Sequence, residues 1–177
     1  MRREQITDRD ADFVGYVTSR LPRLRQLAYL LTQDWHRADD VVQTAVTQLY
    51  VHWRRASGVD NLDAYARTVV VRSFLTERRR WGSRVSLVSV PPDSATAVED
   101  HAGRLAVRAA LAAVPPRQRA TLVLRFYCDL SVEQAAQALG CSPGTVKSQT
   151  ARGLEALRRA LAGTASPAWP TSERSKP

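Results

Sequence analysis

The side chains with the clearest chemical potential lie in one short segment, residues 142–152. Helical periodicity places one set of polar residues on the outer face of a helix: Gly144, Thr145, Lys147, Ser148, Gln149 and Arg152. Gln can pair with adenine and Arg with guanine in a major groove, while Lys and Arg also hold phosphates. Ser142 can cap this helix, which leaves backbone N–H groups of the first turn available to a phosphate. The segment therefore predicts a helix that reads duplex DNA.

The residues before this segment are typical of two helices that cross closely. Ser131 can cap a short helix, and Gly140 permits the left-handed turn that ends it. Ala136 is small enough for close approach, and Val146 supplies an apolar plug. The alternative is a helical hairpin with a merely solvated outer face, but the four features occur together at compatible spacing. They favour a helix-turn-helix.

A second cluster combines cations with aromatic rings. It consists of Arg72, Arg78, Arg79, Arg80 and Arg84, with Phe74 and Trp81 among them. Such a cluster suits single-stranded or melted DNA, because cations follow the phosphates while rings stack on exposed bases. An ordinary helix end, with Arg favoured by the helix dipole and Trp at the core edge, explains the same residues. Both interpretations stay open from the residues alone.

A third polar group, Asp39, Asp40 and Gln43, forms one edge of a predicted helix beside Val42 and Val46. It is either a solvated face or a surface for a partner protein.

Three helices are predicted to position the first part of these groups, with apolar stripes over residues 13–31, 38–53 and 62–74. Pro22 lies inside the first stripe and predicts a kink or a division into two helices. Asp34 can cap the second helix. The third begins near Asp60 or Asn61, and its run Val69, Val70 and Val71 also allows a short strand, although the flanking residues favour a helix.

Periodicity disappears over residues 85–100, which are rich in Pro, Ser, Thr and Ala and predict a flexible linker. A second helical block follows over 101–162, and residues 163–177 predict a disordered tail. The expected fold class is all-α, with two small helical domains at 8–84 and 101–162.

The distribution of charge agrees with this division. The 177 residues have a net charge of +9, distributed as +5 over 1–84, −3 over 85–103 and +7 over 104–177. Two basic blocks around an acidic stretch are typical of two nucleic-acid-binding modules joined by a linker. An Arg-rich proteome is the alternative explanation, because Arg outnumbers Lys 24 to 2.

Other functional classes find little support. Three scattered His and two Cys predict neither a metal site nor a disulfide framework, and no cofactor is expected. Cys128 and Cys141 are interpreted as small apolar residues, with a redox switch as the lesser alternative. We expect no enzyme, because no positioned acid, base or phosphate-cradling loop is recognisable. No apolar stretch is long enough to span a membrane, so a cytoplasmic protein with no membrane partner is expected.

The chain from about residue 12 to 161 resembles bacterial RNA polymerase sigma factors of the extracytoplasmic-function (ECF) class. The resemblance rests on three stretches: Asp39 to Gln43 with Leu49 and Trp53; the Arg-rich end of the third helix; and Leu111, Val114, Pro115, Arg117, Gln118 and Arg119 leading into the helix-turn-helix. The run from Gly144 to Leu154 is especially similar to an actinobacterial group called the SigE family.

This resemblance implies a role for each polar group. Asp39, Asp40 and Gln43 would bind the β′ clamp helices of core polymerase, and the second domain would meet the β flap. Residues Arg72, Phe74, Arg78, Arg79, Arg80 and Trp81 would face the minus-ten promoter element. Residues Ser142, Thr145, Lys147, Ser148, Gln149 and Arg152 would contact the minus-thirty-five element. An anti-sigma factor is a possible further partner.

The mechanism implied is recruitment, in which the polymerase supplies catalysis and this chain supplies promoter specificity. Two weakly binding domains gain effective concentration when a linker tethers them to one polymerase and one promoter. The acidic linker is expected to avoid DNA and to thread the RNA exit path. The competing hypothesis is a stand-alone helix-turn-helix regulator that binds DNA without polymerase.

Overall fold

The computed structural model describes residues 2–84 and 101–164, with side chains described over 9–80 and 106–163. All regular structure in these ranges is helical, which confirms the all-α prediction. The helices are α1 (Arg2–Thr32), α2 (Trp35–Val51), α3 (Trp53–Ala56), α4 (Leu62–Arg84), α5 (His101–Ala113), α6 (Pro116–Leu122), the π-helix η1 (Val123–Tyr127), α7 (Val132–Leu139) and α8 (Pro143–Thr164). The predicted linker and the tail beyond Thr164 lie outside the described residues.

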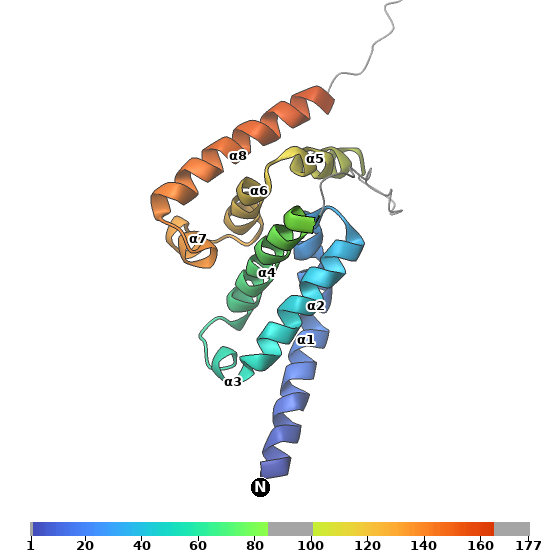
Figure 1. Ribbon diagram of the computed structural model, residues 1–177, viewed down its shortest axis with the longest axis vertical. Coiled ribbons are helices and arrows are strands. Elements are labelled where there is room, and N and C mark those ends of the chain that lie inside the picture. The colour runs from blue at the N-terminus through green and yellow to red at the C-terminus, as the bar shows by residue number, and fades with distance from the viewer. Residues whose placement is uncertain (1, 85–100, 165–177) are drawn as a thin grey trace, which may run out of the picture.

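Helices α1, α2 and α4 pack side by side and form the first domain, with the short α3 at one end (Figure 1). Helix α1 runs without interruption through Pro22, so the predicted division into two helices is wrong. Residues Val69–Val71 lie within α4 and are buried, so the alternative of a short strand is wrong as well.

Side-chain caps explain where two of these helices begin. The Asp34 carboxylate accepts a hydrogen bond from the Arg37 backbone N–H at 3.1 Å, which confirms the predicted cap of α2. The Asn61 side-chain oxygen does the same for Ala64 at 2.9 Å, one turn into α4.

The core of the first domain follows the predicted apolar stripes. Its fully buried members include Leu27, Ala28, Leu31, Ala38, Val41, Ala45, Leu49, Ala66 and Val70. Where α1 meets the start of α3, the Phe13 ring packs edge-on against Trp53 with ring centroids 5.1 Å apart. Such aromatic pairs add about 0.5–1.5 kcal/mol to the area that they bury.

Helices α5 to α8 form the second domain, in which α8 crosses the others as a long arm (Figure 1). Helices α6 and α8 lie close together at Gly153, where an added Cβ would lie 3.1 Å from Leu122 Cγ and 3.3 Å from Gln118 Cβ. Even a methyl group at this position would require Leu122 or Gln118 to shift by a few tenths of an ångström, so the packing favours glycine there.

The two domains also pack directly against each other. Helix α4 contacts α6 and α7, while α1 contacts α5, α6 and η1. Buried residues of both domains, among them Val71 and Ala138, belong to one continuous hydrophobic cluster. The chain is therefore folded back on itself, an arrangement that the sequence did not predict.

In the part of the chain that the structure describes, no helix combines the length and the apolar character needed to cross a lipid bilayer. Over those same residues, His, Cys, Asp and Glu side chains do not gather in groups that could hold a metal ion.

Candidate nucleic-acid interface

The turn between α7 and α8 has the geometry that the sequence predicted. Ser131 and Gln134 form a reciprocal capping box at the start of α7, and Gly140 ends that helix with φ +63°. The Cys141 N–H then bonds to the Ala136 carbonyl at 3.0 Å, and Val146 is completely buried between the helices. The helix-turn-helix is thus fixed by local hydrogen bonds and one apolar plug.

The outer face of α8 begins at a capped helix end. Ser142 Oγ accepts a hydrogen bond from the Thr145 N–H at 3.2 Å and lies 2.9 Å from the Thr145 hydroxyl. Ser148 donates to the Thr145 carbonyl at 2.9 Å, so its hydroxyl still has lone pairs to offer an external donor. The hydroxyls of this first turn therefore organise the end of the helix as well as facing solvent.

The longer side chains of this face differ in exposure. Lys147 and Arg152 are exposed, whereas Gln149 is half-buried. All six predicted residues of the minus-thirty-five group lie on the first three turns of α8 or at its cap. The structure thus brings that group together on one helix.

The predicted minus-ten group, by contrast, is divided. Arg78, Arg79 and Arg80 are exposed on α4, and Arg80 bonds to Glu77 at 3.1 Å. Arg78 and Arg79 share a groove with Arg117 of α6, so three cations from two domains line one surface. Such a surface suits a phosphate backbone. The side chain of Trp81 lies outside the described residues.

Phe74 corrects one prediction. Its ring is only 3% exposed and belongs to the hydrophobic cluster, so it does not face DNA in this structure. The reason is register: Phe74 lies four residues after the fully buried Val70, on the inward face of α4. Phe74 is close to the arginines in the sequence, but its ring lies on the buried face of α4, whereas the arginine side chains lie on the exposed face.

Arg72 is engaged by the second domain. Its Nε and one terminal nitrogen donate to the carbonyls of Ala138 and Gln137 at 2.8 Å each, at the end of α7. Both carbonyls belong to the last turn of α7, where a cation is also favoured by the helix dipole, and the Gln137 carbonyl accepts the Gly140 N–H as well, at 3.4 Å. In this structure Arg72 is therefore held against the second domain.

Arg119 of α6 reaches from the second domain to the first, a role that the sequence did not predict. The residue is 7% exposed, and its guanidinium donates to the Leu31 carbonyl of α1 at 3.0 Å and to the Val114 carbonyl at 3.2 Å. Burial, and then the nearby charge of Arg78, lower its pKa to about 10. The side chain stays protonated near neutral pH and anchors α6 to the first domain.

The predicted polymerase-binding group lies together on the outer edge of α2. Asp39, Asp40 and Gln43 are all exposed. Asp39 forms a two-pronged ion pair with Arg25 of α1, at 2.6 and 2.9 Å, and this pairing raises the pKa of Arg25. Asp40 and Gln43 have no such partner among the described residues and are the more available contacts for another protein.

Comparison with known proteins identifies the two domains. Residues 16–84 match the family Sigma-70 region 2, and residues 104–157 match Sigma-70, region 4. RNA polymerase sigma-E factor of Streptomyces coelicolor is 36% identical over 156 residues, covering 85% of this chain and 86% of the relative. ECF RNA polymerase sigma factor SigM of Mycobacterium tuberculosis is 30% identical, with 78% of this chain and 71% of the relative covered.

A solved structure has the same fold. The sigma factor RpoE of Bartonella quintana, in complex with the anti-sigma factor NepR, superposes with a TM-score of 0.65 and 24% identity, covering 85% of this chain and 97% of that one. Because regions 2 and 4 match most of the chain and full-length relatives align over more than two thirds of their length, the protein belongs to the sigma-70 family of RNA polymerase sigma factors, in its ECF class.

Proposed function

We propose that this chain is a transcription initiation factor that binds core RNA polymerase and directs it to promoters, in the cytoplasm where polymerase acts. The observation that supports this most strongly is the capped, exposed face of α8 in a region 4 domain that follows a region 2 domain in the same chain. The catalytic chemistry belongs to the polymerase. An anti-sigma partner remains a prediction from the family.

Duplex recognition is assigned to the second domain. The exposed, capped N-terminal end of α8 directs the positive end of the helix dipole toward a phosphate, and the following turns present Lys147, Gln149 and Arg152 to base edges and backbone. Gln149 is the proposed base-reading residue in the minus-thirty-five element, while Lys147 and Arg152 supply phosphate contacts.

Polymerase binding is assigned to the edge of α2 formed by Asp39, Asp40 and Gln43. This edge is exposed and carries negative charge in an otherwise basic domain, which suits a cationic protein surface. Melted minus-ten DNA is assigned to the exposed arginines Arg78 and Arg79 with Arg80, without Phe74.

The packed arrangement of the domains bears on this mechanism. Arg72 would join the promoter surface only when its bonds to the α7 carbonyls are released. We therefore propose that binding to polymerase and promoter is accompanied by separation of the two domains.

Run-off transcription with purified core polymerase tests the proposal. The double variant Lys147→Ala with Arg152→Ala is expected to lower initiation at a cognate promoter by about tenfold or more, since each lost contact costs about 1–3 kcal/mol. Arg158→Ala is the matched control, because it removes one arginine from an exposed site further along the same helix.

A second pair of variants tests the α2 edge. Asp40→Lys is expected to weaken binding to core polymerase, while Asp60→Lys, the same charge reversal at an exposed loop position, leaves it unchanged. DNA binding that needs no polymerase, together with no initiation on any template, would instead support a stand-alone regulator.

A further inference from the structure

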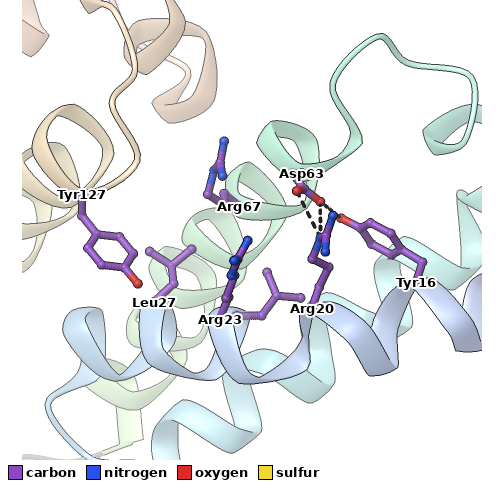
Figure 2. A pocket seen from close by; sticks show the side chains of 8 residues that line it. Tyr16, Arg20, Arg23, Leu27, Asp63, Arg67 and Tyr127 are labelled. Atoms are coloured by element: carbon purple, nitrogen blue, oxygen red, sulfur yellow. Dashed lines mark hydrogen bonds and ion pairs between the residues drawn. The ribbon is translucent and has the colours of Figure 1, made fainter.

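A polar pocket lies where the first domain meets η1, away from both proposed DNA surfaces. Its volume is about 170 Å³, and two leucines of α1 form its apolar floor. The polar lining comes from three elements: Tyr16, Arg20 and Arg23 of α1, Asp63 and Arg67 of α4, and Tyr127 of η1. Figure 2 shows these side chains directed toward one shared space.

One end of the pocket is internally neutral. Arg20 Nε donates to both Asp63 oxygens at 3.0 and 3.1 Å, and the Tyr16 hydroxyl donates to the same carboxylate at 3.1 Å. Partial burial opposes the charge on Asp63, but these hydrogen bonds and the cations around it outweigh that effect and hold its pKa below the usual value. Arg20 and Asp63 therefore compensate each other near neutral pH.

The other end of the pocket carries more positive charge than the single carboxylate of Asp63 can balance. Arg23 and Arg67 form no ion pair with the described residues, and the Arg67 Nε is buried without a hydrogen-bond partner. A buried donor of this kind is unfavourable unless an acceptor from outside the chain forms a hydrogen bond with it. In Figure 2 the two guanidinium groups lie between Asp63 and Tyr127, on the same side of α1. The pocket thus has two excess positive charges beside an orphaned donor.

We propose that this pocket binds the phosphate dianion of a small molecule. Guanidinium groups match phosphate oxygens in charge and in their forked geometry, and two of them balance a charge of about −2. The Tyr127 hydroxyl, which points toward α1 in Figure 2, is the third donor. The phosphate comes either from free inorganic phosphate or from a phosphate monoester.

Because the pocket is lined by both domains, a bound ligand would affect how the domains are arranged. Arg23 and Arg67 belong to the first domain, whereas Tyr127 belongs to the second. A phosphate held by all three would bind the packed arrangement and not the separated one, so it would stabilise the packed form by mass action. This inference concerns the free chain and does not depend on the proposed role in transcription.

Calorimetric titration of the full chain tests the site, with inorganic phosphate and ribose 5-phosphate as probes and chloride at matched ionic strength as the blank. Arg23→Gln and Arg67→Gln are each expected to weaken phosphate binding by about tenfold. Arg55→Gln, at an exposed position of α3 outside the pocket, is expected to leave binding unchanged. Arg23 is itself exposed, so its variant should fold, and circular dichroism verifies this.

The possible outcomes distinguish free phosphate from a phosphate monoester, and one of them would refute the proposal. Equal affinity for both probes identifies free phosphate, while tighter binding of ribose 5-phosphate identifies a monoester. Tyr127→Phe should weaken binding and also reduce the ligand-induced shift in interdomain distance, measured by fluorescence energy transfer. Absence of binding at millimolar concentration, or binding that both arginine variants leave unchanged, would overturn the proposal.

Discussion

The contact between Arg72 and the end of α7 gives a quantitative prediction for the packed arrangement. Arg72→Ala removes two hydrogen bonds of 2.8 Å from a charged donor to the Gln137 and Ala138 carbonyls. Such bonds are worth about 1.5–3 kcal/mol when buried. Because Arg72 lies at an exposed position, we discount the pair to about 1 kcal/mol in total, which shifts the ratio of packed to separated molecules about fivefold.

Fluorescence energy transfer between labels at Thr47 of α2 and Ala162 of α8 measures this ratio, with both labels introduced as non-natural amino acids at exposed positions. Arg72→Ala should lower the population with high transfer efficiency. Arg54→Ala removes an arginine from an exposed site that makes no bond to the second domain, and it should leave the distribution unchanged. If the two variants behave alike, the Arg72 bonds contribute nothing to domain packing and the reasoning is refuted.

Three further predictions concern packing, pH and thiol chemistry. Gly153→Leu should destabilise the second domain by about 1–3 kcal/mol, seen as a lower urea midpoint, because the added atoms would meet Leu122. The pKa of Asp63 is lowered in the folded state, so the ionised carboxylate stabilises the fold above about pH 4, and this stabilisation is lost as the pH falls toward the folded pKa. Asp63→Asn should therefore reduce the dependence of the free energy of unfolding on pH in the acid range, measured by urea titration at a series of pH values. Burial raises the pKa of the Cys128 thiol to about 11, so at pH 8 a thiol reagent should label the half-buried Cys141 first, as peptide mass mapping would show.

The sequence was sufficient for those features that depend on local rules. Apolar periodicity identified the long helices, and the caps at Asp34, Ser131 and Ser142 followed from residue type and position. The turn at Gly140 was equally readable, because its positive φ is one that glycine adopts at little cost. Helical periodicity also predicted the outer face of α8, on which every predicted residue except the half-buried Gln149 is exposed.

The remaining features depend on tertiary packing. Which carbonyl a long arginine reaches is decided by the placement of whole helices, so Arg72 and Arg119 could not be recognised as interdomain contacts. Phe74 is different, since a signal was present: it continues the apolar stripe through Val70, and that periodicity outweighs its arginine neighbours. The π-helix η1, which brings Tyr127 to the phosphate pocket, has no pattern in the sequence that would distinguish it from an ordinary helical turn.

The most direct measurement is the mapping of transcript start sites produced in vitro on fragmented genomic DNA by core polymerase with and without this protein. The proposed function predicts a set of new starts that share two upstream sequence elements, and the loss of that set when Lys147 and Arg152 are both replaced by Ala. Identical start sites with and without the protein, under conditions in which a known sigma factor redirects the same core enzyme, would contradict it.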